Sequence, residues 1–191
     1  MTTARLEAFS DAVIAILITI MVLELRIPHE AELDALRDVA PVFLVYVLSF
    51  VNLAIYWNNH HHLMVLTDRI NGKILWANIH LLFWLSLVPF TTGWMGENDF
   101  AELPTTAYGI VLLLAAIAYY ILQATIISAQ GPASRLANAL GRDLKGKASP
   151  VLYIAGIALA YVNRWIAIGF YVVVALMWLI PDRRIESIVT E

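Results

Sequence analysis

The chain has 191 residues, of which 61% are hydrophobic and 14% are charged, and its mean hydropathy is +0.75. Water-soluble domains usually carry about a quarter charged residues, so this composition excludes a soluble fold and indicates one integral membrane domain over residues 1–191. The formal net charge of −3, without a basic block, excludes a nucleic-acid partner, and the lack of cysteine excludes disulfides and thiolate metal sites.

The first apolar run, Ala12–Leu23, is shorter than the roughly 20 residues that cross a bilayer as a helix. It crosses only if Asp11 is accepted inside the membrane and if the helix continues to Ile27, where Pro28 stops it. We therefore expect a helix over residues 4–27. An ionisable group within a membrane helix usually faces protein and marks function, so Asp11 is a candidate functional residue.

Five further stretches lack Asp, Glu, Lys and Arg, and each is long enough, or nearly so, to cross a membrane as a helix. They predict helices at about 39–66, 73–95, 104–129, 148–163 and 165–181. Pro89 predicts a kink or break late in the third helix. The segment Gly131–Ser149, rich in Gly, Pro, Ser and basic residues, is expected to be a connecting loop. The predicted fold is an all-α integral membrane protein with six transmembrane helices.

The basic residues predict the orientation of these helices. With both termini in the cytoplasm, nine of the twelve Lys and Arg residues lie inside, as the positive-inside rule requires. The cytoplasmic set is Arg5, Arg69, Lys73, Arg135, Arg142, Lys145, Lys147, Arg183 and Arg184, and the outer set is Arg26, Arg37 and Arg164. We expect a multi-pass protein of the cell membrane, with the lipid bilayer as a partner.

The first helix carries a stripe of residues at spacing i, i+3, i+4 and i+7, namely Ile16, Thr19, Ile20 and Leu23. This spacing fits a helix-packing seam, and it fits equally the wall of a pore that is narrowed by apolar side chains. Asp11 falls on the other side of the helix and should be paired inside the bundle, with Arg5 as one candidate partner. Beside a histidine, such a buried carboxylate would make pH sensing plausible.

The second helix contains the most polar stretch of any predicted crossing, from Tyr56 to His62. Consecutive histidines point about 100° apart on a helix, so they do not chelate one metal, which favours spacing i, i+4. The chain has five histidines, too few for a membrane di-iron enzyme, so we expect neither a structural metal site nor an enzyme. Asn78 on the third helix lies at the depth of Asp11 and the histidines, which predicts a hydrogen-bonded cluster joining the first three helices.

Three motifs together resemble one family. They are Arg5-x-x-x-Phe9-Ser10-Asp11, Tyr56-Trp57-x-x-His60-His61, and Asn78 with Pro89-Phe90. The chain resembles a prokaryotic member of the transmembrane protein 175 family, the endosomal and lysosomal potassium channels. The resemblance implies a homotetramer around a central pore. It also implies potassium-selective, leak-type conduction without a conventional filter loop or cofactor.

The resemblance also assigns roles to residues of this chain. Ile16 would form the pore bottleneck, with Ile20 and Leu23 further out, and Thr19 would supply a hydroxyl linked to selectivity for the permeant potassium ion. A bracing network would include Arg5, Phe9, Ser10, Asp11, Trp57, His60, His61 and Asn78. His62 departs from the family pattern. The alternatives to a channel are a small secondary transporter or proton-coupled carrier, and a non-conducting scaffold.

Overall fold

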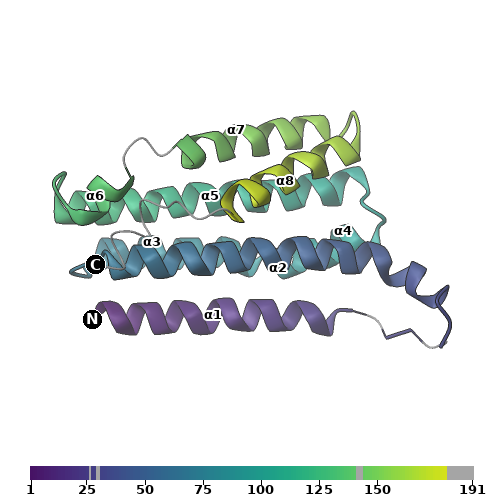
Figure 1. The fold of residues 1–191 in the computed structure, drawn as a ribbon, viewed down its shortest axis with the longest axis horizontal. Coiled ribbons are helices and arrows are strands. Elements are labelled where there is room, and N and C mark those ends of the chain that lie inside the picture. The colour runs from purple at the N-terminus through teal and green to yellow at the C-terminus, as the bar shows by residue number, and fades with distance from the viewer. Residues whose placement is uncertain (26, 29–30, 141–143, 180–191) are drawn as a thin grey trace.

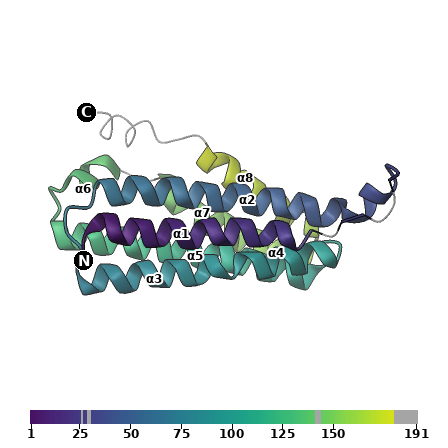
Figure 2. The same ribbon diagram turned by 90° about the horizontal axis from the view of Figure 1, so that it is seen from below.

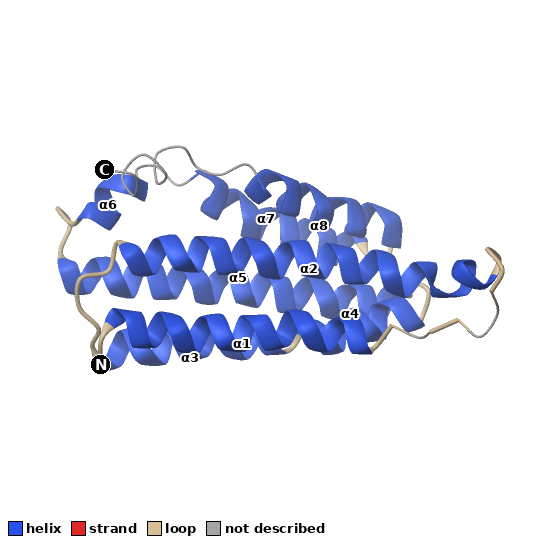
Figure 3. Cartoon of the chain, turned by 60° about the horizontal axis from the view of Figure 1, so that its bottom comes forward, coloured by secondary structure: helices blue, strands red, loops and turns tan. Residues whose placement is uncertain are grey.

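The structure is a computed structural model that describes residues 1–25, 27–28, 31–140 and 144–179. This part of the chain consists of helices and their connections (Figure 3). The helices in chain order are α1 (Thr3–Leu23), α2 (Ala35–Val65), α3 (Gly72–Ser86), α4 (Val88–Glu97), α5 (Glu102–Gln130), α6 (Arg135–Leu140), α7 (Leu144–Leu159) and α8 (Arg164–Leu179). The all-α class predicted from the sequence is therefore observed in the described residues.

The long helices lie side by side in an elongated bundle (Figure 1). α1 forms one edge, α7 and α8 form the opposite edge, and α2, α3, α4 and α5 lie between them. α1 packs against α2, α3 and α4. The view in Figure 2 shows α1 across the front of the bundle with no described helix over it. One side of α1 is thus uncovered in the single chain.

Four helical segments are long and apolar enough to cross a membrane: Thr3–Leu23, Val39–Val65, Gly72–Glu97 and Glu102–Gln130. The third of these combines α3 and α4, and α8 is a shorter apolar helix. These segments agree with an integral membrane protein. That α7 and α8 also cross stays a prediction.

The first helix ends earlier than the sequence predicts. α1 stops at Leu23 with Glu24 as its C-cap, where the prediction continued to Ile27. Pro28 disfavours the helical conformation at the residue before it and has no backbone N–H to donate, so it acts upstream of its own position. The helix therefore spans 21 residues, with Asp11 inside it.

The break predicted from Pro89 is confirmed. α3 ends at Ser86, α4 begins at Val88, and Leu87 between them caps both helices. Pro89 lies in the first turn of α4, where its missing N–H costs no intrahelical hydrogen bond. The third predicted crossing is therefore two helices in series.

The segment Gly131–Ser149 was expected to be a loop, and this expectation is wrong. It contains α6, and α7 begins within it at Leu144. The Ser134 hydroxyl accepts a hydrogen bond of 3.3 Å from the Ala137 backbone N–H at the start of α6. Leu136 and Ala139 are buried in the bundle core. Burial of these apolar side chains stabilises the helix despite the flanking Gly and Pro.

Two clusters of buried side chains hold the bundle together. The first joins α1, α2, α3 and α5 through residues such as Ile14, Leu53, Leu81 and Leu122. The second joins α2, α4, α5, α7 and α8 around Tyr108, Tyr153 and Tyr171. The Tyr171 ring centroid lies 5.9 Å from that of Tyr108 and 6.1 Å from that of Tyr153. α1 belongs to the first cluster, so its position depends on α2, α3 and α5.

Candidate functional site

Three buried side chains tie α1 to α2 and α3, and we call them the anchor network: Ser10, His60 and Asn78. Asn78 Nδ2 donates to Ser10 Oγ over 2.9 Å, and Asn78 Oδ1 lies 2.7 Å from His60 Nε2. Because the Asn78 amide already donates to Ser10, its oxygen accepts and His60 Nε2 carries the proton. Ser10 in turn donates to the Leu6 carbonyl over 2.9 Å. All three residues are fully buried, so the network is part of the core.

The local sequence explains why these side chains meet. Ser10 lies on the buried face of α1, which also carries Leu6, Ile14, Leu17 and Met21 at helical spacing. The Thr2 side chain caps α1 by accepting from the Arg5 N–H. The Asn71 side chain caps α3 by accepting from the Ile74 N–H over 3.0 Å. These caps fix where the two helices begin, and thereby the register at which Asn78 faces Ser10.

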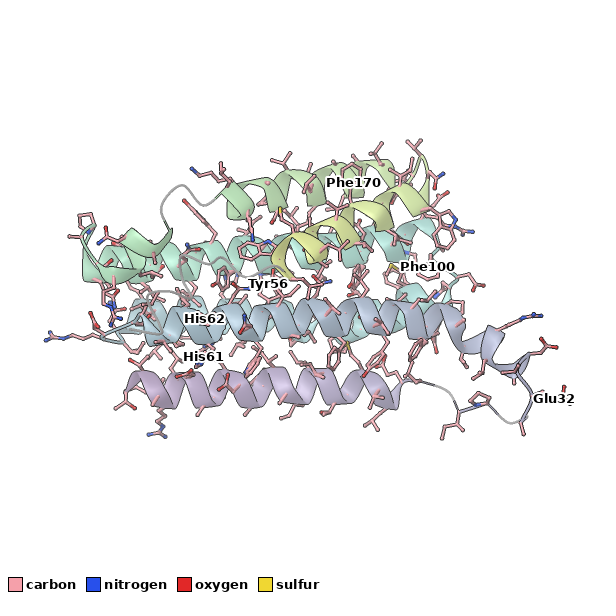
Figure 4. All side chains as sticks on the ribbon, in the orientation of Figure 1. Glu32, Tyr56, His61, His62, Phe100 and Phe170 are labelled. Carbon is pink, nitrogen blue, oxygen red and sulfur yellow. The ribbon has the colours of Figure 1, made fainter. Side chains whose placement is uncertain are left out.

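A second polar contact between α1 and α2 lies beside the anchor network. His61 Nδ1 is 2.6 Å from Glu7 Oε1, with the Glu7 side chain 22% exposed. Figure 4 shows His61 on the side of α2 that faces α1. Sequence reasoning missed Glu7. The available signal was its position one helical turn before Asp11, which places both carboxylates on neighbouring parts of one face.

Two polar atoms near the network have no hydrogen-bond partner in the described residues. They are Asp11 Oδ1 and His60 Nδ1, and both atoms are buried. Asp11, Glu7 and His61 all interact electrostatically with His60. The sequence suggested an ion pair between Arg5 and Asp11. This pair is not formed among the described residues, and Arg5 is exposed. Asp11 is therefore placed beside the network with one oxygen free to accept.

Two other residues of the expected bracing network lie outside it in the single chain. Phe9 is 54% exposed and Trp57 is 47% exposed. Both are large aromatic side chains next to network members, Phe9 before Ser10 and Trp57 three residues before His60. Their exposure leaves them available to another chain or to lipid.

The expected stripe on α1 occupies the uncovered side of that helix. Ile16, Ile20 and Leu23 are 55%, 41% and 81% exposed, and Thr19 is also exposed. The helix-packing seam that the spacing allowed is therefore not made within one chain. The buried seam of α1 is instead the face that carries Ser10 and Ile14.

Thr19 has a hydroxyl whose proton is already used. Its Oγ1 donates to the Ala15 carbonyl at 3.0 Å or the Ile16 carbonyl at 2.9 Å. A hydroxyl that donates to its own helix presents its lone pairs outward, and oxygen lone pairs suit hard cations. Within the described ranges, no group of three or more His, Asp or Glu side chains is placed to hold a metal ion. The exposed Thr19 oxygen is suited to transient contact with an ion.

Comparison with known proteins connects this arrangement to a family. The model of the family described as "Endosomal/lysosomal potassium channel TMEM175" matches residues 5–89, which contain most of α1 and all of α2 and α3. A potassium channel of a Chryseobacterium species is 52% identical to this chain over 191 residues. The match covers 100% of both chains.

More distant relatives share both the sequence and the fold. A potassium channel of Chamaesiphon minutus is 29% identical, with 91% of this chain and 92% of the relative covered. The crystal structure of a lysosomal potassium-selective channel TMEM175 homologue from Chamaesiphon minutus superimposes with a TM-score of 0.82 at 27% identity. That match covers 93% of this chain and 96% of the other. The chain belongs to the TMEM175 family of potassium channels.

Proposed function

We propose that this protein is a potassium channel in which α1 lines the pore and Ile16 forms its narrowest ring. The single observation that carries the pore assignment is the uncovered stripe of α1, where Ile16, Ile20 and Leu23 are 55%, 41% and 81% exposed. The 52% identity with a potassium channel of a Chryseobacterium species supports potassium as the permeant ion. The function is that of an integral membrane ion channel.

The pore forms when copies of α1 meet around an axis as a homotetramer, each contributing its stripe. A ring of Ile16 side chains excludes water and so sets the barrier to ion passage. Thr19, one turn away, contributes an oxygen whose lone pairs contact potassium as it passes. No filter loop of backbone carbonyls is required by this arrangement. Potassium is the permeant ion, the chain needs no cofactor, and no catalytic step is assigned.

The anchor network holds α1 at the angle that this pore needs. Ser10 is bonded to Asn78 and through it to His60, so rotation of α1 breaks buried hydrogen bonds. Asp11 Oδ1, buried without a partner in the single chain, is available to a donor from a neighbouring subunit. Arg5, Phe9 and Trp57 are exposed close by and form part of the same subunit boundary.

The proposed topology has six crossings with both termini in the cytoplasm of a cell-membrane protein. The basic residues support this orientation through the positive-inside rule. α7 and α8 have 16 residues each. At 1.5 Å per residue each is about 24 Å long, against a hydrocarbon core of about 30 Å. The last two crossings are therefore accommodated by local thinning of the bilayer around them.

Potassium efflux from liposomes tests the pore assignment. Ile16→Asn wets the constriction, so we expect potassium efflux several times faster than wild type and linear in the gradient. Ile117→Asn is the matched control, because Ile117 is 37% exposed on α5 and lies away from the stripe. It should leave efflux unchanged. Unchanged or abolished efflux in Ile16→Asn would count against Ile16 as the constriction.

A small secondary transporter or proton-coupled carrier is the alternative function. Its supporting observation is the break at Leu87, since carriers often place discontinuous helices at their sites. A carrier gives flux that saturates with potassium concentration and is coupled to a second ion. Efflux that saturates in both wild type and Ile16→Asn would favour the carrier. A non-conducting scaffold would give no efflux in either protein.

A further inference from the structure

A cavity lies on the opposite side of α2 from α1, between α2, α5, α7 and α8. Together with the space that is open to the outside, its volume is about 570 Å³. Figure 4 shows Tyr56, one of its lining residues, on the edge of α2 toward α8. The anchor network and the α1 stripe are not among its lining residues. The cavity is therefore a separate feature from the proposed pore.

Polar groups without protein partners line this cavity. Gln123 is 6% exposed and Tyr153 is 2% exposed. Neither side chain makes a hydrogen bond to any residue that the structure describes, and the same holds for the Tyr56 hydroxyl. Buried polar groups are normally hydrogen-bonded, because an unpaired one costs about 1–3 kcal/mol. The amide of Gln123 and the hydroxyls of Tyr56 and Tyr153 are therefore available to hydrogen-bond a molecule in the cavity, either water or a ligand.

Other lining groups are fixed and shape the walls. The Tyr119 hydroxyl donates to the Asn59 carbonyl over 3.1 Å, which joins α5 to α2. Trp178 Nε1 donates to Ser149 Oγ over 2.8 Å, which joins α8 to α7. These contacts fix the Tyr119 and Trp178 rings in the lining of the cavity, where the Tyr119 ring also packs edge-on against Tyr56 at a centroid distance of 6.1 Å. An aromatic ligand packs favourably against such rings.

The charge of the lining restricts the ligand further. The described residues around the cavity carry amides, hydroxyls, aromatic rings and aliphatic groups, and none of these described residues is Asp, Glu, Lys, Arg or His. A charged ligand would lose its hydration without gaining an ion pair, which is strongly unfavourable. The walls belong in part to α2 and α5, two of the membrane-capable segments. A ligand that enters at this depth must also tolerate the bilayer, so it is uncharged.

We propose that this cavity is a binding site for a small uncharged aromatic compound that carries one hydrogen-bond donor. The ring lies among Tyr56, Tyr119 and Trp178, and its donor bonds to the Gln123 amide oxygen. The site adjoins α2 at Asn59, the residue before His60 of the anchor network. The proposal concerns binding alone and does not depend on the proposed ion conduction.

Equilibrium dialysis of the whole chain in detergent tests this site, with indole as the probe. Naphthalene lacks the donor, and tryptamine carries the same ring with a positive charge. Empty micelles give the partition background. We expect saturable indole binding at one site per chain, with tryptamine at least tenfold weaker and naphthalene weaker than indole. Indole that only partitions, in proportion to its concentration, would mean that the cavity holds water, and it would overturn the proposal.

Three variants locate the binding. Gln123→Leu removes the amide at similar size, and indole affinity should fall at least tenfold, equivalent to about 1.4 kcal/mol. Ala116→Leu fills the cavity and should abolish saturable binding. Thr125→Val is the control, because Thr125 is only partly buried on the same helix and does not line the cavity. If gel filtration shows that one lining variant does not fold, the other variant and the comparison of indole with tryptamine still test the site. Binding that survives both lining variants, or tryptamine bound as tightly as indole, would overturn the assignment.

Discussion

The side-chain amide of Asn78 on α3 donates a 2.9 Å hydrogen bond to the hydroxyl of Ser10 on α1. This bond crosses the interior of the bundle, where both residues are fully buried. It continues through His60 to α2, so three helices share one polar connection. In an apolar interior such a connection is directional, unlike the packing of Ile14 or Leu81 around it. It fixes the rotation of α1 as well as its distance from its neighbours.

Asn78→Leu should therefore destabilise the protein. The substitution keeps the volume but leaves the Ser10 oxygen and the His60 Nε2 proton buried without partners. Each unpaired group costs about 1–3 kcal/mol, and we expect a loss of unfolding free energy in that range or above it. Thermal unfolding in detergent measures the change.

Ser10→Ala provides the check on this interpretation. If the bond between Ser10 and Asn78 carries the effect, the double variant should cost less than the sum of the two single variants. Strictly additive losses would show that the two residues act independently.

Glu7→Gln should have a smaller effect than Asn78→Leu. The Glu7 carboxylate lies 2.6 Å from His61 Nδ1, but the His61 side chain is 46% exposed. The contact is an ion pair only when His61 is protonated. Partly exposed ion pairs contribute about 0.2–1 kcal/mol, and added salt weakens them. Unfolding of wild type and Glu7→Gln at low and high salt measures this contribution. Arg5→Gln, at an exposed site on the same helix, should leave stability unchanged. A Glu7→Gln loss that is the same at both salt concentrations would contradict an ion-pair origin.

The extent to which the sequence predicts this site follows from the physics of each residue. Polar side chains in apolar helices are expensive, so Asp11, the histidines of α2 and Asn78 at one depth indicate a cluster. Ser10 was expected there only from the family motif. Glu7 lies near the start of its helix, where a carboxylate needs no buried partner, so its only signal is its place one helical turn before Asp11. The stripe from Ile16 to Leu23 has the spacing of any packed helix. Only the packing of the folded chain shows that this face of α1 is exposed and that the opposite face is buried.

The differences between the predicted and the observed fold also have physical causes. Pro89 predicts the break at Leu87 because a missing backbone N–H acts locally. α6 is hidden from local reasoning, since its stability depends on burial of Leu136 and Ala139 in a distant core. α1 ends several residues before Pro28. A proline in the sequence indicates that a helix ends before it, but not how many residues before it.

Glu24 should give the stability a pH dependence. Burial, followed by repulsion from Glu97, raises the pKa of the Glu24 carboxyl above its ordinary value of 4.5. The folded state then binds this proton more tightly than the unfolded state, so this contribution to stability is lost as the pH rises through the raised pKa. Glu24→Gln should therefore be more stable than wild type at neutral pH, and the two should converge as the pH falls below 4.5.

Thermal unfolding of both proteins across this pH range makes the measurement. Lower stability of Glu24→Gln at neutral pH would show that the charged carboxylate is favourable in the fold.

Gly96→Ala should destabilise the contact between α2 and α4. A Cβ at position 96 would lie 2.7 Å from the Val42 Cα and 3.2 Å from the Val42 Cβ, and a backbone atom cannot move aside as a side-chain tip does. Overpacking of this kind costs about 1–3 kcal/mol. It exceeds the gain of about 0.5–1 kcal/mol from replacing a helical glycine by alanine. Gly169→Ala is the control, because a Cβ there meets nothing within 4 Å, and it should be neutral or stabilising. Equal thermal stability of the two variants would show that α2 and α4 can separate at this contact without loss of stability.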